Sequence, residues 1–311
     1  MKKKIGKYIC HWEIFDNSKP LLVSFENRSS AQLSYPKDGW AENFCSSQKI
    51  NYICIITNQT CWYLDDDIYL VAKWLSLNFH DNRVGYGGSM GAFAAANLSN
   101  IFDLSKLILL NPISSLSSNF APFESRFKKD EHLFGSSDFY DAAETKCKAQ
   151  IYMVWDRFQN QDNLHARRFQ IHNKNVSTLI TSFSGHGAPI MLVKYRLLKL
   201  LVNNVLNDEC ELSTFRKVIM SKNKKNINYL KEVIERLHKK KKYHSLFIVI
   251  SYCIKNNYKI TEAADMNRDL SIILKMIDND LAYKLIAMAQ AIRPSGKVIK
   301  KLIDNWETTG K

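Results

Sequence analysis

Long apolar runs, paired cysteines and nucleic-acid-binding motifs are absent from this sequence of 311 residues. No uninterrupted apolar segment approaches the ~20 residues that a membrane-spanning helix requires. The residues Lys2 to Lys4 imitate the basic start of a signal peptide, but Lys7, His11 and Glu13 interrupt any apolar stretch after them. We therefore expect neither a membrane-spanning helix nor a secretory leader.

The seven cysteines are odd in number and scattered along the chain, and none belongs to a Cys-x-x-Cys pair. Such a set is typical of reduced thiols in a reducing compartment. No pair of histidines stands at metal-ligand spacing beside a carboxylate, so we expect no metal site. These absences favour a cytoplasmic protein with free thiols.

Basic residues outnumber acidic ones, 44 to 30, which gives a net charge of +14. Such a charge suits nucleic acid, an anionic membrane surface, an anionic polymer or solubility alone. Neither a Cys/His finger spacing nor a glycine-aromatic RNA-binding motif is present, so we expect no nucleic-acid partner. An anionic glycan and peripheral contact with an anionic membrane surface are the partner hypotheses, and the sequence leaves the oligomeric state open.

Short apolar segments alternate with helical patterns through the first two thirds of the chain. This alternation predicts a mostly parallel sheet flanked by helices and joined by right-handed crossovers, an α/β fold. In such a sheet the chemistry lies at the carboxyl ends of the strands. The predicted strands are residues 8–15, 21–25, 50–56, 84–86, 106–110, 150–155 and 176–181, and residues 67–79 form a crossover helix.

Two further regions differ in character from the sheet segments. Residues 114–148 form a long, aromatic-rich insertion, which predicts a lid over the site. Beyond residue 206, apolar residues recur at helix spacing with no strand signal. We therefore predict a catalytic domain over 1–206 and an α-helical domain of four or five helices over 207–311. The lysine runs 222–225 and 239–242 are read as solvated helix ends or, alternatively, as a docking site for an anionic surface.

The chain is organised around Gly87-Gly88-Ser89-Met90-Gly91, which follows an apolar segment and precedes a run of alanines. This context predicts a strand, a sharp turn and a helix, as the Gly-x-Ser-x-Gly nucleophile elbow requires. Residues beside such a serine must be tiny, because strand and helix approach closely. The alternative is a glycine-rich turn that holds a phosphate at a helix N-terminus.

A serine nucleophile needs a base, usually a histidine oriented by a carboxylate. His186 stands between two glycines on a loop after the last predicted strand. Asp156 follows the strand 150–155 directly, and Asp162 stands six residues further on. We favour Asp156 as the acid, because a strand end is rigidly placed, whereas Asp162 can instead cap a helix. The chain order of Ser89, the acid and His186 is that of an α/β-hydrolase.

With these motifs, residues 20–205 resemble the α/β-hydrolase superfamily. The resemblance implies acyl transfer through a serine acyl-enzyme, without a metal or an organic cofactor, and with an acyl donor such as acyl-CoA if the protein is a transferase. It also implies an oxyanion hole that uses the N–H of Met90 and a second N–H from the loop after the first buried strand. That loop lacks the family's usual His-Gly pattern, so Glu26 and Asn27 are both candidates for the second donor.

The sequence thus predicts a serine esterase or acyltransferase that acts on an acyl ester. In outline it is similar to bacterial enzymes that add or remove O-acetyl groups on anionic surface glycans. One alternative is an inactive hydrolase-fold scaffold whose basic helical region recruits a partner, because fold does not imply activity. Another is a thioesterase that acts on acyl groups bound to a carrier protein.

Overall fold

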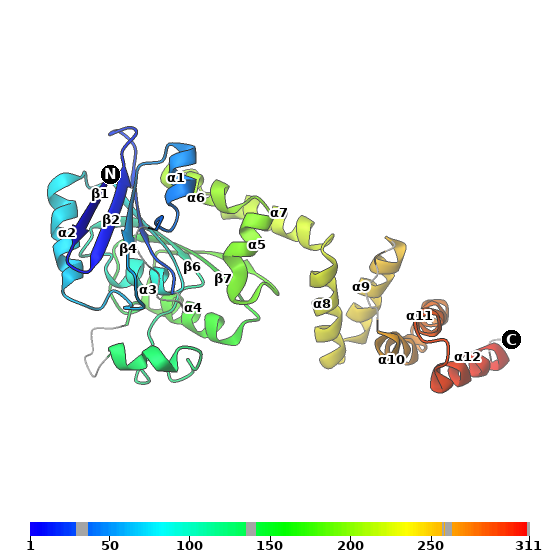
Figure 1. The fold of residues 1–311 in the computed structure, drawn as a ribbon. Helices are drawn as coiled ribbons and strands as arrows, with labels where there is room; N and C mark the ends of the chain where they lie inside the picture. The colour runs from blue at the N-terminus through cyan, green and yellow to red at the C-terminus, as the bar shows by residue number, and fades with distance from the viewer. Residues whose placement is uncertain (29–36, 135–140, 257, 259–262, 310–311) are drawn as a thin grey trace. The chain divides into compact units, whose positions relative to one another are not determined.

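The computed structural model describes the whole chain except residues 29–36, 135–140, 257, 259–262 and 310–311. The chain divides into two compact units, residues 1–219 and 220–311 (Figure 1). Each unit has a hydrophobic core of its own, so each is described separately.

The first unit contains a twisted sheet, which has eight strands in the described part of the chain, in the order β1-β2-β4-β3-β5-β6-β7-β8. The strands from β3 to β8 pair in parallel, whereas β2 is antiparallel to both of its neighbours. All seven predicted strands are present, and the mostly parallel α/β fold is confirmed. The strands are β1 (Lys2–Ile5), β2 (Tyr8–Glu13), β3 (Leu21–Phe25), β4 (Tyr52–Ile56), β5 (Arg83–Gly88), β6 (Leu104–Leu110), β7 (Gln150–Asp156) and β8 (Val176–Thr181).

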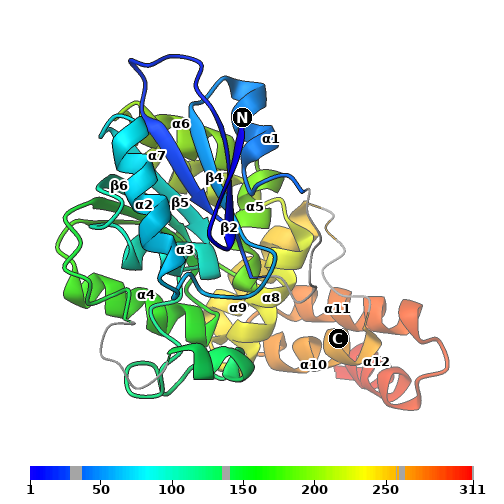
Figure 2. The same cartoon turned by 60° about the vertical axis from the view of Figure 1, so that its left-hand side comes forward.

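Helices cover both faces of this sheet (Figure 2). Alternate strand residues point to opposite faces, so Val23 and Ile53 pack in one cluster while Leu22 and Cys54 pack in the other. The first face carries α2 (Asp67–Asn78), α3 (Met90–Asn97) and α4 (Asn160–His172), and the second carries α1 (Glu42–Gln48), α5 (Ala188–Lys194) and α6 (Leu198–Leu206). Central strands buried on both sides explain why their sequences are continuous apolar runs.

Strand β1 was not predicted, because its lysines imitate the start of a signal peptide. It forms an antiparallel hairpin with β2, in which Lys2 lies opposite His11 and Ile5 opposite Tyr8. Gly6 occupies the turn with a φ of 55°, which a glycine adopts without strain. Lysines on an edge strand are a common protection against pairing with another sheet edge.

The division between the units lies at residue 219, thirteen residues beyond the predicted boundary at 206. The difference arises from helix α7 (Leu212–Asn223), whose first half belongs to the sheet domain. Phe215 and Ile219 are buried in the same cluster as Val205 and Leu206 of α6. Those apolar contacts extend the first unit past the last helix that covers the sheet.

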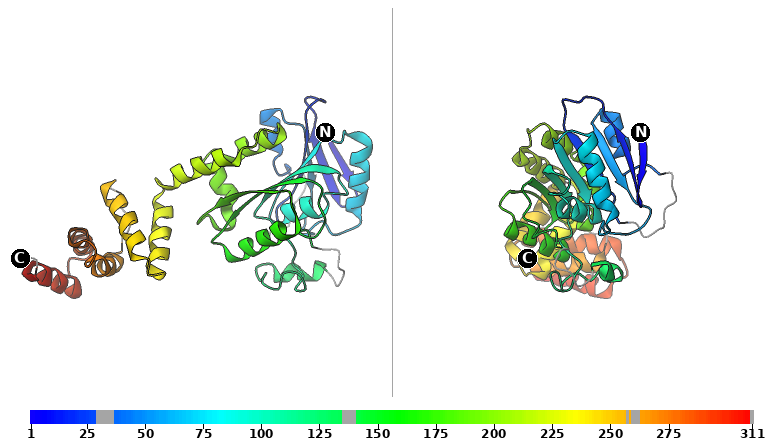
Figure 3. Two further views of the ribbon diagram at one scale, coloured as in Figure 1. Left: turned by 180° about the vertical axis from the view of Figure 1, so that it is seen from behind. Right: turned by 90° about the vertical axis from the view of Figure 1, so that its left-hand side faces the viewer.

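The second unit is helical, as predicted (Figure 3). In the described part of residues 220–311 its helices are α8 (Ile227–Lys239), α9 (Tyr243–Lys255), α10 (Ala264–Leu274), α11 (Asn279–Ile292) and α12 (Lys297–Thr309), after the end of α7. Helix α12 was not predicted, although Ile299, Ile303 and Trp306 stand at helical spacing and are buried. The lysines of both runs are exposed at or beyond the ends of α7 and α8. None of the helices in the described residues combines the length and apolar character needed to cross a membrane.

Candidate active site

Ser89 lies at the tip of a sharp turn between β5 and α3, at the carboxyl end of the central strand. Its φ of 48° and ψ of −111° lie in a region that residues other than glycine rarely adopt. A Cβ atom added to Gly87 would lie 2.2 Å from the backbone of Gly91, and one added to Gly91 would lie 2.4 Å from the carbonyl oxygen of Phe25. Strand, turn and helix therefore have the geometry of a nucleophile elbow.

His186 reaches this serine from the loop after β8, within the 3-10 turn η2 (Gly185–Gly187). The distance from its Nε2 to Ser89 Oγ is 3.1 Å, within hydrogen-bond reach. The side-chain amide of Asn111, which follows β6, donates to the carbonyl oxygen of His186. The hydrogen bond from Asn111 thus fixes the backbone of His186, while the imidazole ring, about one third exposed, stays accessible.

The carboxylate that contacts the imidazole is that of Asp162. Both of its oxygens lie 2.9 Å from His186 Nδ1, and its side chain is fully buried. A carboxylate only accepts, so Nδ1 donates to it and Nε2 is left to accept the proton of Ser89. Ser89, His186 and Asp162 therefore form a continuous hydrogen-bonded chain.

Asp156, the acid favoured from the sequence, does not contact the imidazole. One of its oxygens accepts the N–H groups of Ser184, at 2.5 Å, and Gly185, at 2.7 Å. The other accepts the N–H of Phe158 at 2.8 Å. Asp156 lies opposite Thr181 in the sheet, so its side chain reaches the backbone of the loop that follows β8. The preference for Asp156 over Asp162 is thereby corrected.

The reason for preferring Asp156 was that Asp162 could cap the following helix. The structure assigns that capping to Gln159, whose side chain accepts the N–H groups of Gln161 and Asp162. Asp162 stands in the first turn of α4 with its carboxylate free to face the histidine loop. Asp156 instead fixes the backbone of the same loop, because its carboxylate accepts hydrogen bonds from the N–H groups of Ser184 and Gly185.

A buried ionic network continues from Asp162 into the insertion. Arg126 Nη1 donates to Asp162 Oδ1 at 2.6 Å, and Arg126 Nη2 donates to Glu124 Oε2 at 2.6 Å. Glu124 in turn accepts a hydrogen bond from His165 Nε2 at 2.9 Å. Arg126 Nη1 also lies 3.3 Å from Nδ1 of His186, and the two share Asp162 as acceptor.

His165 is neutral in this network. The backbone N–H of Ser114 points at its Nδ1 at 3.1 Å, so Nδ1 accepts and Nε2 carries the proton. Burial also lowers the pKa of His165 below its usual range. Burial alone would raise the pKa of Glu124, but hydrogen bonds from His165 and Arg126 outweigh it and lower that pKa to about 2. Glu124 is therefore a carboxylate, which neutralises Arg126 together with Asp162.

Sequence reasoning did not find Glu124 and Arg126, because the insertion has no periodic pattern that would place its side chains. A signal existed for His165, which follows Asp162 by three residues on α4 and so shares its helix face. Within the described part of the insertion, Phe127 lies near His186, with the two ring centroids 6.3 Å apart. Two of the aromatic residues on which the lid prediction rested, Phe139 and Tyr140, lie outside the described residues.

The expected oxyanion donors lie on both sides of the elbow. Met90 is the first residue of α3, so its N–H has no partner within the helix. The N–H of Glu26 is already used, because it donates to Tyr63 Oη at 2.7 Å. Asn27 is exposed, and its Oδ1 lies 2.8 Å from the point where Gly88 would carry a Cβ. Of the two expected second donors, Glu26 is therefore excluded in this geometry and Asn27 stays a candidate.

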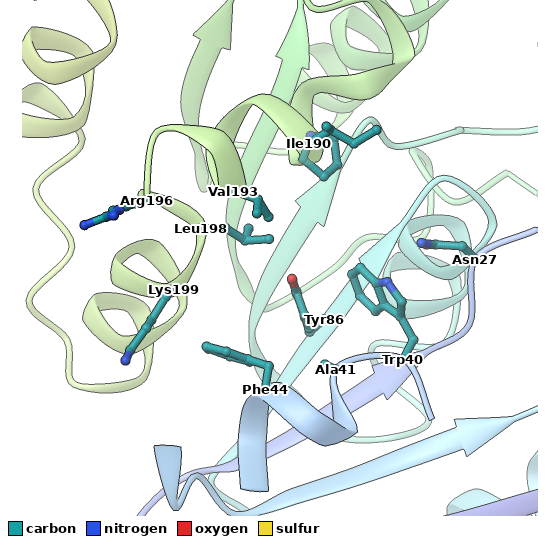
Figure 4. Close-up of a pocket in the computed structure, with 11 residues that line it drawn as sticks. Asn27, Trp40, Ala41, Phe44, Tyr86, Ile190, Val193, Arg196, Leu198 and Lys199 are labelled. Atoms are coloured by element: carbon teal, nitrogen blue, oxygen red, sulfur yellow. The ribbon is translucent and has the colours of Figure 1, made fainter. Parts of the chain in front are cut away.

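A pocket of about 640 Å³ opens between α1, β5 and the helices α5 and α6 (Figure 4). Asn27 lies at one end of it, and Pro189 and Ile190 connect it to the loop that carries His186. The pocket therefore borders the segments that carry Ser89 and His186, because Asn27 lies beside Gly88, but neither Ser89 nor His186 lines it. Among the described residues, no group of three or more side chains is arranged to hold a metal ion. The pocket is lined by Asn27, Trp40, Ala41, Phe44, Tyr86, Pro189, Ile190, Val193, Arg196, Leu198 and Lys199.

Known proteins are similar to this chain in three-dimensional structure. Neither a protein-family model nor a curated protein matches the sequence. The capsule O-acetyltransferase of Neisseria meningitidis serogroup A is 14% identical over 63% of this chain and 91% of its own, with a TM-score of 0.49. The Thermogutta terrifontis esterase Est2 is 14% identical over 67% of this chain and 93% of its own, with a TM-score of 0.48. The fluorophosphonate-binding serine hydrolase F of Staphylococcus aureus is 16% identical over 63% and 95%, with a TM-score of 0.44.

With TM-scores below 0.5, these similarities carry no argument about this chain. The chain's own topology carries the assignment: a mostly parallel sheet, an elbow serine after β5 and the loop after β3 packed beside it. The chain order of serine, aspartate and histidine agrees with this. Residues 1–219 therefore have the fold of the α/β-hydrolase superfamily.

Proposed function

We propose that this protein is a serine-nucleophile acyl-ester hydrolase or acyltransferase, with Ser89, His186 and Asp162 as its triad. The observation that carries the proposal is the position of the His186 ring, with Nε2 at 3.1 Å from Ser89 Oγ and Nδ1 at 2.9 Å from Asp162. This is the arrangement in which an imidazole acts as a general base toward a serine.

In the proposed mechanism, Ser89 Oγ attacks the ester carbonyl while His186 Nε2 takes its proton. The N–H of Met90, with Asn27 as second donor, stabilises the oxyanion of the tetrahedral intermediate. The imidazolium then protonates the departing alcohol, which leaves the acyl group on Ser89. A water molecule or an acceptor hydroxyl, deprotonated by His186, attacks the acyl-enzyme and restores the serine. Asp162 holds the imidazole tautomer and balances its charge in each half-reaction.

Hydrolysis of p-nitrophenyl acetate tests this proposal. Ser89→Ala is expected to lower kcat by at least about 1,000-fold, because the acyl-enzyme can no longer form. Ser76→Ala is a matched control, since Ser76 is exposed on α2 and, among the described residues, its hydroxyl donates only to the carbonyl oxygen of Lys73. Equal rates from wild type and Ser89→Ala would remove Ser89 as the nucleophile.

A fluorophosphonate probe separates an enzyme from an inactive scaffold of the same fold. An activated Ser89 becomes labelled, whereas a serine without a base does not. Labelling that is lost in both Ser89→Ala and His186→Ala is the expected result. No labelling of the wild-type protein would favour the scaffold hypothesis, in which the helical region 220–311 recruits a partner.

The substrate hypothesis is an O-acyl or O-acetyl group on an anionic glycan, with acyl-CoA as donor if the protein is a transferase. Its support is the net charge of +14, which favours anionic partners. Release of acetate from an O-acetylated acidic polysaccharide, compared with a neutral one, tests this substrate class. Faster release from an acyl carrier protein thioester than from either polysaccharide would favour the thioesterase alternative.

A further inference from the structure

The pocket between α1, β5 and α5–α6 has apolar walls. One end of it is lined by Asn27, after β3, and by Pro189, after the loop that carries His186. Trp40 and Tyr86 stack within it, with ring centroids 4.3 Å apart and an interplanar angle of 27°. Phe44, Val193 and Leu198 complete the apolar lining (Figure 4). A surface of this kind takes an apolar segment of a ligand, because burying apolar area removes it from water.

One polar group inside the pocket has no partner in the described part of the protein. Tyr86 is 3% exposed, and Figure 4 shows its hydroxyl directed into the pocket. No hydrogen bond joins that hydroxyl to another described residue, and burial raises the pKa of Tyr86 far above its usual range. The hydroxyl therefore stays protonated and is available to donate to an acceptor on a ligand.

Two cations lie at the end of the pocket opposite Asn27. Arg196 and Lys199 both line it (Figure 4), and neither forms an ion pair with any residue that the structure describes. No carboxylate is among the described residues of the lining. The pocket thus runs from Asn27, which lies beside Gly88, across apolar walls and one hydroxyl donor, to the end lined by Arg196 and Lys199.

We propose that this pocket binds the acyl chain of the substrate and that the chain carries an anionic group, a carboxylate or a phosphate, at its far end. The inference rests on the proposed function, because the ester carbonyl is placed at Ser89. The apolar part of the chain lies along Trp40 and Phe44. The anionic group accepts from Tyr86 Oη and lies toward the end of the pocket that Arg196 and Lys199 line.

Chain-length and charge series of p-nitrophenyl esters test the inference. The acetyl ester is compared with the octanoyl ester and with esters of the same length that carry a terminal carboxylate or phosphate. The anionic esters are expected to show the highest kcat/KM. Whichever of the two anions gives the higher value identifies the head group. A kcat/KM that is highest for the acetyl ester, or equal for neutral and anionic chains, would overturn the inference.

Pocket variants connect this preference to its residues. Tyr86→Phe is expected to lower the preference for the anionic ester by about three- to ten-fold, the effect of one hydrogen bond. The double change Arg196→Gln and Lys199→Gln is expected to lower it by about three- to ten-fold as well. The control is Lys194→Gln, because Lys194 is exposed on α5 but does not line the pocket. An equal effect of the control would overturn the assignment.

Binding to Ser89→Ala, measured by calorimetry, separates failure of the pocket from failure of the proposed function. Monomethyl octanedioate is expected to bind more tightly than methyl octanoate, and Tyr86→Phe in the same background should reduce the difference. If this holds while the wild-type protein hydrolyses no ester, the pocket stands and the proposed function falls. If the wild type hydrolyses the acetyl ester but neither octane compound binds to Ser89→Ala, the function stands and the pocket inference falls.

Discussion

Arg126 donates to Asp162 at 2.6 Å and, through its other terminal nitrogen, to Glu124 at 2.6 Å. The carboxylate that contacts the His186 ring is therefore tied to the insertion between β6 and β7. Asp162 is fully buried and the side chain of Glu124 is 1% exposed, so the guanidinium is the group that compensates both charges. The geometry links the stability of the insertion to the geometry of the triad.

Replacing Arg126 by Gln should destabilise the protein by about 3–5 kcal/mol, because two buried carboxylates then lose their common cation. Arg126→Lys should lower the stability by less, since lysine keeps the positive charge but lacks the planar guanidinium whose two terminal nitrogens contact both carboxylates. Urea denaturation measures both changes. In the double variant Arg126→Gln and Glu124→Gln, part of the stability should return, because one uncompensated charge is gone. An unchanged midpoint for Arg126→Gln would show that the network does not stabilise the fold.

Asp162→Asn should reduce kcat on p-nitrophenyl acetate by about 10⁴-fold, because the amide neither fixes the imidazole tautomer nor balances its charge. Asp156→Asn should reduce kcat by only about 10- to 100-fold, from weaker support of the histidine loop. Steady-state kinetics of the two isosteric variants measure the contrast. A larger loss for Asp156→Asn would return the role of triad acid to that residue.

Gly91→Ala should abolish ester hydrolysis, because the new Cβ would lie 2.4 Å from the carbonyl oxygen of Phe25 and force α3 away from β3. Gly187→Ala is the matched control: its Cβ would meet only Ile190 Cδ1 at an ordinary 3.7 Å, and its φ is −98°. Thermal denaturation should show a loss of stability for Gly91→Ala alone. If the alanine at position 91 is tolerated, the close packing of the elbow is not required.

Acid should weaken the fold through Glu124 and His165. Glu124 has a folded-state pKa of about 2 against an ordinary value of 4.5, so the unfolded chain takes up its proton first as the pH falls. Its contribution, up to about 3 kcal/mol, is present above pH 4.5 and is lost as the pH falls toward 2. The lowered pKa of His165 acts in the same direction, starting below about pH 6.5.

Urea midpoints between pH 7 and pH 3 measure this dependence. Glu124→Gln should flatten the decline below pH 4.5, whereas His244→Gln, an exposed histidine in the second unit, should leave it unchanged. A wild-type decline that Glu124→Gln does not alter would assign the acid sensitivity to other carboxylates.

Truncation after Lys224 should leave a folded and active sheet domain, because all of α7 is retained. Truncation after Leu206 should be less stable, because it removes Phe215 and Ile219 from the cluster that they share with Val205. Thermal denaturation and p-nitrophenyl acetate hydrolysis compare the two fragments. If both fragments behave alike, α7 does not belong to the sheet domain.

The sequence by itself determined the strands and the nucleophile turn. Strands buried on both faces must be continuous apolar runs, so the sequence predicts strand 21–25 with the bounds that the structure shows. The elbow was predictable as well, because Gly87 and Gly91 lie where backbone meets backbone and no side chain fits. Such local requirements act within a few residues and therefore appear in the sequence.

The tertiary structure alone decided which groups the site uses. The sequence favours Asp156 over Asp162 as the acid, but the carboxylate that lies 2.9 Å from His186 Nδ1 is that of Asp162. The N–H of Glu26 is excluded as the second oxyanion donor, because it donates to Tyr63, a residue from a distant segment of the chain. Arg126 reached the triad from an insertion without periodicity. A hydrogen bond requires that two groups, often from segments far apart in the chain, lie within a few tenths of an ångström of a fixed distance. Sequence patterns determine which residues share a face of a helix or strand and how they are spaced, but not those distances.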